Sequence, residues 1–569
     1  MRKVLIFGLL ALISFSSINA QTEWWQTMSL YQIYPRSWMD SDGDGIGDLK
    51  GIESKLQHLV DAGIDAFWIS PMYQSPMADF GYDISNFRDV DPIFGTLADF
   101  DNLVKTAKSL GLKVILDFVP NHSSDQHDWF VRSLAKEDPY TDYYVWHNGT
   151  ATETGIRNPP NNWVSVFGGS AWTWRSERQA YYLHQFAVEQ PDLNYRNEYV
   201  VQEMKDVLTF WLNRGVDGFR IDAIPMLFED PDFPDEPLSG TTNVTTEYGY
   251  TLPHYTQHLD ETYQMVTQWR AVLDNFTSSS DNVSRIMMME AYANTSSVMK
   301  YYDAGAHFPF NFELITSVDG SSSAADIKSA IDNWLDNVPS GGTSDWVIGN
   351  HDRNRVASRY TREQIDALNI VNLLLPGVSV TYYGEEIGME DVWVSWEDTQ
   401  DPQGCGGDET TYESLSRDPE RSPMQWDATT SAGFSANKST WLPVHENYLT
   451  LNLAAQVTAE VSHYKKLFRL SLKHCLYINF FYSAIFFFYR VLSGSDPVYV
   501  VANFANSTET VSLDVFEDAS SELKVSIASV HASNVVVEKI KLLHLLHKLF
   551  IDMILTNSIT DCFITYSNL

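Results

Sequence analysis

Four apolar runs of the sequence end in side chains that can exchange protons or carry charge. Each of these groups alone would be explained as a helix N-cap or as part of a structural salt bridge. Four such run ends brought to one edge of a fold instead predict a catalytic site. The groups are Asp117 and His122 after the run at 113–119, Asp222 after 218–221, Glu290 at the end of 286–290, and His351 and Asp352 after 346–350.

Short apolar runs alternate with helical stretches up to about residue 390, and these elements must position the polar groups. The alternation is typical of βα units around a parallel sheet, and the runs lack polar alternation, as strands covered on both faces do. Eight runs predict an α/β fold, a closed (β/α)8 TIM barrel with its catalytic groups at the carboxyl ends of the strands. Apolar positions at helical spacing predict helices at 49–61 and 97–110. The runs lie at 29–34, 66–70, 113–119, 218–221, 286–290, 307–312, 346–350 and 378–383.

Two irregular stretches interrupt the barrel pattern. The connection after the third run is long and contains Asn-Pro-Pro, Gly-Gly and clustered Trp, which predicts an inserted lobe at 123–195. A second irregular region, rich in Gly, Asp, Ser and Pro, lies at about 390–442. The barrel is therefore assigned to 21–122 and 196–466, and strands at 497–503 and 511–515 predict a partial C-terminal antiparallel β-domain at 490–537.

The charge balance restricts the class of partner. Seventy-four acidic residues against 38 basic ones give a formal net charge of −36, which would repel phosphate backbones and anionic lipid headgroups. Nucleic acid is therefore not expected as a partner. Aromatic residues make up 13% of the chain, and acidic and aromatic side chains together fit a carbohydrate site. Surface acidity alone would also explain the charge.

The first twenty residues have the pattern of a signal peptide, with Arg2 and Lys3 before an apolar run that leads to Ala20. The run is too short to span a membrane, so secretion is expected. The three cysteines cannot form a disulfide framework for a chain of this size. A glycosylation sequon at Asn121 is expected to be a buried site residue, whereas glycan acceptors are expected among Asn148, Asn243, Asn275, Asn282, Asn294, Asn437 and Asn506.

The polar run ends closely resemble the four signature regions of the α-amylase family of glycoside hydrolases. These regions are 117–122, 218–225, 289–292 and 348–352. Residues 190–195 resemble the marker of the α-glucosidase and oligo-1,6-glucosidase branch, and 32–37, 167–172 and 421–426 match as well. The chain is most similar to insect gut maltases over about 24–466 and 490–530. This resemblance implies a secreted enzyme of the gut lumen or the apical cell surface.

The resemblance implies a retaining α-glucosidase that acts on terminal α-1,4-linked glucose of maltose, short malto-oligosaccharides and sucrose. Asp222 is then the nucleophile, Glu290 the general acid/base and Asp352 the carboxylate that stabilises the transition state. A retaining mechanism needs one ionised and one protonated carboxyl about 5–5.5 Å apart. Crowded negative charge would raise the pKa of Glu290, and Arg220, on the same strand face as Asp222, should keep Asp222 ionised.

The same resemblance implies a substrate pocket around these acids. Asp79, Tyr82 and Arg421 would hold the terminal glucose and close one end, which makes the enzyme exo-acting. His122 and His351 would bind glucose hydroxyls, although a lone His is more often structural. Phe167 and Phe186 would line the mouth, with a plain core role as the alternative.

The residue after the nucleophile acts as a linkage selector in this branch, where Val accompanies α-1,6 cleavage and smaller or polar residues accompany α-1,4 bonds and sucrose. The selector here is Ala223, whose methyl group leaves room beside the leaving group. Maltose and sucrose are therefore predicted to be better substrates than isomaltose.

A metal site is predicted just after the first strand, and no organic cofactor is expected. Oxygen ligands at alternating positions, separated by glycines that allow tight turns, suit Ca²⁺. The alternative is an acidic turn in which the last carboxylate caps the following helix. The related glucosidases share this loop, and the ion would be structural. The predicted ligands are Asp40, Asp42, Asp44, Ile46 and Asp48.

Two stretches depart from the family pattern. Residues 467–489 and 538–569 are enriched in Phe, Tyr, Ile, Asn and Lys, as translated A/T-rich non-coding DNA is. The hypothesis is a retained intron or an erroneous gene model. The apolar part of the first stretch, 476–489, is too short to span a bilayer, and the tail lacks the uninterrupted apolar stretch of a lipid-anchor signal. Membrane association is expected only through an anchor that this C-terminus does not show.

Two other functions fit part of the pattern. A non-catalytic, receptor-like member of the family would typically lack catalytic carboxylates, and all three are present. A glucosyl-transferring or sucrose-isomerising enzyme would have the same catalytic residues, so only its products would distinguish it from a hydrolase.

Overall fold

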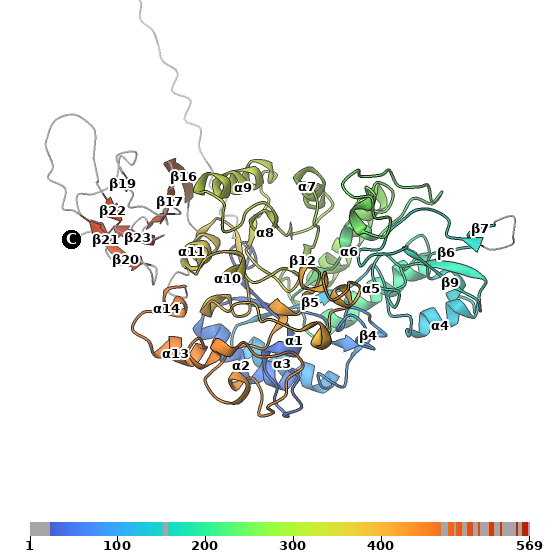
Figure 1. Ribbon diagram of the computed structural model, residues 1–569, viewed down its shortest axis with the longest axis horizontal. Coiled ribbons are helices and arrows are strands. Elements are labelled where there is room, and N and C mark those ends of the chain that lie inside the picture. The colour runs from blue at the N-terminus through green and yellow to red at the C-terminus, as the bar shows by residue number, and fades with distance from the viewer. Residues whose placement is uncertain are drawn as a thin grey trace, which may run out of the picture.

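The computed structural model describes residues 23–151, 157–362 and 364–467, together with short strands between 476 and 566. The expected signal peptide at 1–20 lies outside the described residues. Figure 1 shows a large central body of strands and helices, with the segment labelled α4 to β9 on one side and the terminal strands on the other.

The central sheet confirms the predicted eight parallel strands. Its order is β13-β12-β11-β5-β2-β1-β15-β14, and each neighbouring pair runs in parallel. The strands are β1 (Ser29–Ile33), β2 (Ala66–Ile69), β5 (Lys113–Phe118), β11 (Gly218–Ile221), β12 (Ile286–Met289), β13 (Phe308–Pro309), β14 (Asp345–Val347) and β15 (Val378–Tyr382).

The two ends of this order are joined at β13 and β14 by a buried carboxylate. The backbone N–H of Asn311, just after β13, donates to Asp345 at the start of β14 over 3.1 Å. Both side chains are fully buried. Phe308 and Val347 from the two strands also belong to one apolar cluster with Leu30 and Met288, so the interior is packed with side chains, as in other small barrels.

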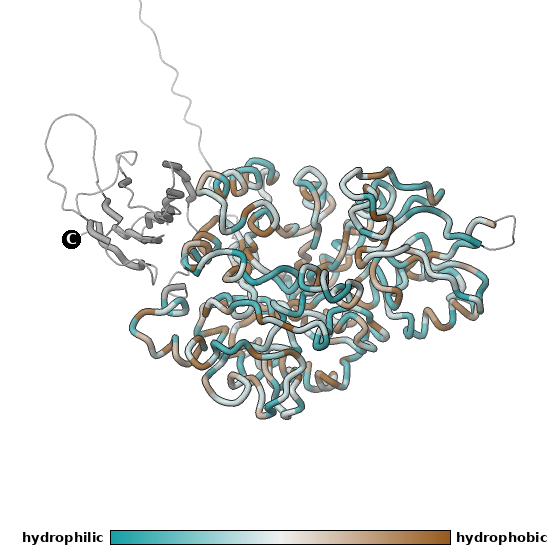
Figure 2. Tube along the Cα trace, in the orientation of Figure 1, coloured by the Kyte–Doolittle hydropathy of each residue, from teal (hydrophilic) through white to brown (hydrophobic). Residues whose placement is uncertain are grey.

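Helices follow most of the strands, and the two predicted from sequence are confirmed at 49–61 and, one residue shorter, at 97–109. Each of these begins with a capping carboxylate or hydroxyl: Asp48 accepts the Gly51 N–H, and Thr96 and Asp99 form a capping box. Each of the two helices has one buried, mostly apolar face. Figure 2 shows hydrophilic and hydrophobic stretches following each other along the trace. The helices are α2 (Leu49–Asp61), α3 (Leu97–Ser109), α5 (Glu198–Asn213), α6 (Asp260–Ser279), α7 (Thr295–Asp303), α8 (Glu313–Thr316), α9 (Ala324–Asn337), α10 (Val356–Arg359) and α11 (Ile365–Leu374).

The segment 123–195 forms its own small apolar cluster. Trp163, Trp172 and Leu183 are buried in it, and Phe233 and Tyr255 from a later connection pack against it. A three-stranded sheet in the order β6-β10-β9 supports this cluster. The elements are α4 (Asp128–Leu134), β6 (Trp146–His147), β7 (Thr150–Ala151), β8 (Arg157–Asn158), β9 (Trp172–Arg175) and β10 (Ala180–Leu183).

Two further connections at the carboxyl ends of the strands are long. Residues 222–259, between β11 and α6, contain only the short 3-10 turns η2 (Ile224–Met226) and η3 (Tyr248–Tyr250). Sequence analysis did not single out this connection. The irregular region predicted at 390–442 contains α12 (Pro402–Cys405) and several 3-10 turns, and it precedes α13 (Leu453–Thr458) and α14 (His463–Leu467).

The C-terminal strands form antiparallel sheets, as predicted for that region. One sheet has the order β16-β17-β18-β23-β20 and the other β19-β22-β21. Strands from 467–489 and 538–569 take part, but their pairing does not test the hypothesis about the origin of those stretches. In the described part of the chain, no helix is long and apolar enough to cross a membrane. The strands are β16 (Leu476–Tyr482), β17 (Ile485–Val491), β18 (Val498–Asn503), β19 (Thr510–Val511), β20 (Leu523–Ala528), β21 (Val535–Val537), β22 (Met553–Leu555) and β23 (Thr560–Tyr566).

Candidate active site

Most of the predicted catalytic and substrate-binding residues line one cavity of about 1080 Å³. Arg220 and Arg421 are not part of its lining, because both are buried behind it with 2% and 0% exposure. The predicted residues that line the cavity are Asp79, Tyr82, His122, Phe167, Phe186, Asp222, Ala223, Glu290, His351 and Asp352.

The guanidinium group of Arg220 joins three carboxylates beneath the cavity. Its Nη1 donates to Asp117 Oδ1 at 2.9 Å and also contacts Asp222 Oδ1, while its Nη2 lies 2.8 Å from Glu290 Oε1. Trp68 covers one face of the guanidinium, with its ring centroid 4.9 Å from the central carbon. One cation thus fixes the positions of the two acids that the sequence nominated as nucleophile and acid/base.

Strand register explains how these groups meet. Arg220 on β11 is paired with Asp117 on β5 and with Met288 on β12, so their side chains share one face. Asp222 lies two residues beyond Arg220 and therefore follows it on that face, while Glu290 follows Met288 in the same way. Side chains two residues apart on a strand point to the same face. Arg220, Asp117, Asp222 and Glu290 therefore lie together at one end of the barrel interior.

Ala223 links the nucleophile candidate to the acid/base candidate. Its backbone is left-handed, with φ of 46°, a conformation that costs a residue with a Cβ about 1–2 kcal/mol. In this conformation its N–H donates to Glu290 Oε2 over 2.9 Å. Ala223, the predicted linkage selector, therefore also orients Glu290, the predicted general acid/base.

The three acids at the cavity differ in protonation. Burial raises the pKa of Glu290 to about 8 and that of Asp222 to about 7, and Arg220 opposes both shifts. Burial also favours neutral Asp352, but the positive charges of Arg417, Arg421 and Arg220 outweigh it, so the pKa of Asp352 lies below its ordinary value. Arg220 thus acts on Asp222 in the expected direction, but burial has the larger effect.

A hydrogen-bonded chain connects the predicted histidine to the acid cluster. His351 Nδ1 lies 2.7 Å from Gln32 Nε2, and its Nε2 lies 2.5 Å from the Tyr82 hydroxyl, which donates to Asp117 over 3.2 Å. Burial lowers the pKa of His351 well below its ordinary value, so the ring is neutral.

The second predicted histidine is equally buried. His122 Nε2 lies 3.1 Å from Gln190 Nε2, and burial lowers its pKa to about 3. The neighbouring Asn121 is only 2% exposed, which supports the expectation that it carries no glycan. Phe186 packs on His122, with 5.1 Å between ring centroids, and meets Phe167 edge-on at 6.0 Å.

Arg421 is predicted to hold the terminal glucose together with Asp79 and Tyr82, and the structure adds a second arginine, Arg417, which contacts Asp79 directly. Arg417 Nη2 lies 2.9 Å from Asp79 Oδ1 and 2.6 Å from Asp401 Oδ1, and its Nη1 lies 3.1 Å from Asp352 Oδ1. Arg421 bonds to Asp352 at 3.0 Å and to the His351 carbonyl at 2.7 Å from behind. Arg417 stands in the same irregular region, four residues before Arg421, and that adjacency was the available signal.

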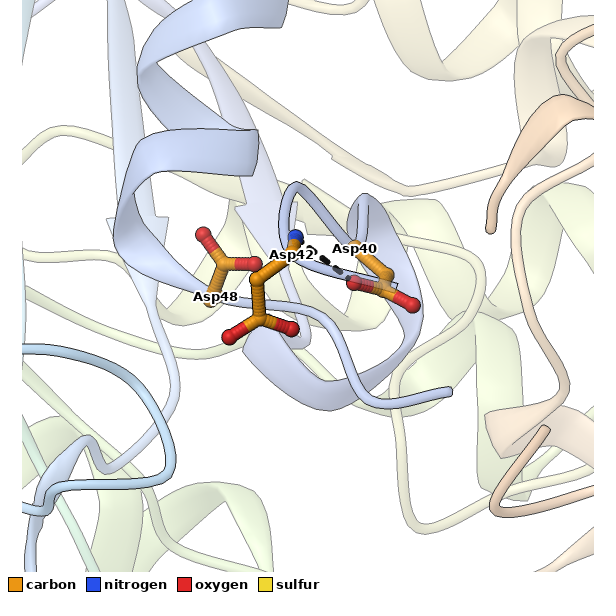
Figure 3. A group of neighbouring side chains, drawn as sticks. All are labelled: Asp40, Asp42 and Asp48. Atoms are coloured by element: carbon orange, nitrogen blue, oxygen red, sulfur yellow. Dashed lines mark hydrogen bonds between the residues drawn. The ribbon is translucent and has the colours of Figure 1, made fainter. Parts of the chain in front are cut away.

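Three of the five predicted metal ligands converge. Oxygens of Asp40, Asp42 and Asp48 all lie within 4.8 Å of one another. Figure 3 shows these three side chains on the loop before α2. The Asp44 carboxylate is not part of this group and accepts the Ile46 N–H over 2.7 Å. Hard carboxylate oxygens of this kind fit Ca²⁺.

Two positions of this loop require glycine. A Cβ on Gly47 would lie 2.1 Å from the Pro35 carbonyl oxygen, and Gly45 has a φ of +97°. The Asp48 carboxylate accepts the Gly51 N–H and thereby caps α2, so the acidic-turn alternative describes one real role of this residue.

Comparison with known proteins gives a consistent result. The profile described as alpha amylase, catalytic domain, matches residues 32–474. An alpha-glucosidase of Apis mellifera is 50% identical over 541 residues, 92% of this chain and 93% of that protein. A salivary alpha-glucosidase of Aedes aegypti is 51% identical over 80% of each chain. The crystal structure of the alpha-glucosyl transfer enzyme XgtA superposes with a TM-score of 0.81 at 32% identity, covering 96% of this chain and 100% of that one.

We expect Glu290 to hold a proton at pH 6 and to lose it with a midpoint near pH 8, because burial raises its pKa to about 8. Infrared difference spectra between pH 6 and pH 9 should show loss of a protonated carboxyl band. The part of this change due to Glu290 should be absent from Glu290→Gln, while the change from Asp222 remains. A Glu290 component that titrates between pH 4 and 5 would contradict the expectation.

Proposed function

The chain belongs to the α-amylase family of glycoside hydrolases, and from this membership we propose that it is a retaining exo-α-glucosidase. Its substrates would be maltose, short malto-oligosaccharides and sucrose, from which it would release terminal glucose. The observation that carries this proposal is the contact of Arg220 with both Asp222 and Glu290 at a cavity that Asp79 and Arg417 also line.

The first step forms a bond between an Asp222 oxygen and the anomeric carbon of the terminal glucose. The bond from that carbon to the glycosidic oxygen breaks, and Glu290 gives its proton to this oxygen, so the remaining sugar leaves as an alcohol. In the second step Glu290 takes a proton from water as the water oxygen bonds to the same carbon. The bond from this carbon to the Asp222 oxygen breaks at the same time, Asp222 leaves as a carboxylate, and glucose is released with its original configuration.

The protein environment suits these roles. The raised pKa of Glu290 favours the protonated form needed to assist the leaving group, as in other carboxyl pairs tuned apart by their surroundings. Asp352 stays ionised between Arg417 and Arg421, where a carboxylate can stabilise positive charge on the sugar ring. Arg220 supplies the charge-assisted hydrogen bonds that hold Asp222 and Glu290 in place.

The ion pairs around Arg417 support exo action. The Arg417 guanidinium spans Asp79, Asp352 and Asp401, and Phe167 covers it with a ring centroid 5.2 Å away. In the proposed function this group of ion pairs closes the pocket beyond the terminal glucose, so that no second sugar binds there. Carbohydrate chains would therefore enter with their non-reducing end first.

Two alternatives remain distinguishable by experiment. A transferase or sucrose isomerase would use the same acids, and the similarity to XgtA gives this candidate weight. Product analysis at high sugar concentration separates it from a hydrolase. A receptor-like function is disfavoured because the three carboxylates and the cavity are retained.

Secretion and a structural Ca²⁺ complete the proposal. The basic-apolar-small pattern at 1–20 and the salivary relative support export to an extracellular space, such as the gut lumen or the apical surface. Asp40, Asp42 and Asp48 would hold the ion with oxygens, and Asp44 and Ile46 would join them. The ion would brace the loop between β1 and α2 rather than take part in the reaction.

Asp222→Asn is expected to lower kcat for maltose by at least about 10⁴-fold, because the nucleophile is lost while the shape is kept. The control is Asp206→Asn on the exposed surface of α5, which should keep full activity. Thermal melts should show both variants folded. NMR of the wild-type reaction should show α-glucose first; β-glucose as the first product, or normal turnover by Asp222→Asn, would refute the mechanism.

For linkage, kcat/KM is expected to be higher for maltose and sucrose than for isomaltose. Ala223→Val should shift the maltose-to-isomaltose ratio toward isomaltose by about tenfold, since one or two methyl groups beside a leaving group can discriminate to this extent. Ala455→Val on exposed α13 serves as the matched control. A wild-type preference for isomaltose would overturn the selector role.

Calcium is expected to raise the melting temperature of the protein by a few degrees relative to a sample in chelator, because an ion that binds only the folded state stabilises it. Asp42→Ala should abolish this shift, and Asp61→Ala on the exposed face of α2 should preserve it. Equal melting temperatures with Ca²⁺ and chelator would contradict the metal site.

A further inference from the structure

The connection 222–259 forms one wall of the cavity from its base to its mouth. Near the base, Asp222 is 7% exposed, whereas Tyr248 and Val244 are 38% and 49% exposed. The exposed Tyr248 and Val244 therefore mark the part of this wall that opens to solvent. The wall residues are Asp222, Ala223, Pro225, Met226, Val244, Thr246, Glu247, Tyr248, Pro253 and Gln257.

Two polar side chains of this wall are bonded to each other. Gln257 Nε2 donates to the Tyr248 hydroxyl over 2.8 Å. A tyrosine hydroxyl that accepts one bond keeps its proton for donation, and a glutamine amide keeps its carbonyl oxygen and a second N–H. The Tyr248–Gln257 pair therefore offers donors and an acceptor between the apolar Met226 and Pro253, which is how sugar hydroxyls are bound in a mostly apolar site.

A second, small cavity lies behind this pair. It has a volume of about 20 Å³, room for roughly one water molecule. Tyr248 and Gln257 line both cavities, as do Val166, Met226 and Pro253. The Tyr248–Gln257 pair therefore separates the two cavities. Its position depends on the residues that support it on the side of the small cavity.

The buried carboxylate of Glu236 supports the Tyr248–Gln257 pair. Glu236 is 3% exposed, and its two oxygens accept the N–H groups of His254 and Tyr255 at 2.8 and 2.7 Å and the hydroxyl of Thr256 at 3.2 Å. Three bonds to one carboxylate fix the three residues that immediately precede Gln257 in the chain.

Glu236 is itself fixed to the inserted lobe. Its N–H donates to Asn162 Oδ1 at 2.8 Å, and Asn162 Nδ2 donates to its carbonyl at 2.9 Å. The Trp163 indole N–H donates to the neighbouring Pro234 carbonyl at 2.9 Å. The lobe thus supports the pair through Glu236.

We propose that Tyr248 and Gln257 form a binding subsite for the hydroxyls of an α-linked oligosaccharide beyond the leaving-group sugar, and that Glu236 is its positioning residue. This inference rests on the proposed function. In that function Asp79 and Arg417 hold the terminal glucose, so further sugars would extend toward the exposed part of the cavity, where Tyr248 lies. The subsite would favour maltotriose and maltotetraose over maltose.

The test compares kcat/KM for maltose, maltotriose and maltotetraose in Gln257→Leu and Tyr248→Phe. Each variant should lose about three- to tenfold for maltotetraose relative to maltose, the value of one or two hydrogen bonds. Gln202→Leu on exposed α5 is the matched control and should leave the ratio unchanged. Unchanged ratios in both variants would overturn the subsite.

Glu236→Ala should reproduce the selective loss, and Glu236→Gln, which keeps an acceptor oxygen, should restore part of it. Equal losses for all substrates together with a lower melting temperature would mark Glu236 as merely structural and would overturn its positioning role. A wild-type enzyme inactive on every α-glucoside would instead refute the proposed function, and the subsite with it. The two failures are therefore distinguishable.

Discussion

The buried guanidinium of Arg220 is the constraint on which the site depends. Three carboxylates, Asp117, Asp222 and Glu290, contact one cation that is only 2% exposed. Buried charge is costly unless it is paired, and three acids against one base leave negative charge that is most readily removed by binding a proton. Glu290, with the highest pKa of the three, is the group that keeps it. The same cluster thus sets both the positions of Asp222 and Glu290 and the protonation of Glu290.

The barrel makes this cluster possible, because parallel register places Asp117 beside Arg220 and sends Asp222 and Glu290 to one end. The connections then supply the lining of the cavity. Arg417 and Asp79 contribute charged groups, and the connection 222–259 and the inserted lobe contribute apolar ones such as Met226 and Phe186. The lobe also supports the charged groups, because Phe167 lies over Arg417 and Gln190 donates to Asp79.

Sequence reasoning succeeded where a local pattern carries the information. Buried apolar runs predicted all eight strands, and helical spacing predicted 49–61. The polar run ends predicted that Asp222, Glu290 and Asp352 would lie together, as they do at the cavity, and their catalytic roles stay predictions. It did not find Arg417 or Glu236, because their partners lie in distant or irregular segments without periodicity: Asp79 is 338 residues from Arg417. It also underestimated burial at Asp222, since the desolvation of a carboxylate depends on the whole surrounding fold.

The central claim is that Asp222 becomes covalently attached to glucose while Arg220 and Glu290 hold the site. The most direct test incubates the enzyme with a fluorinated α-glucosyl fluoride that forms the intermediate faster than water removes it, followed by peptide mass spectrometry. A glucosyl adduct on the peptide containing Asp222, at the side chain itself, is the predicted result. An adduct on another residue, or an enzyme that turns over maltose yet is never labelled, would contradict it.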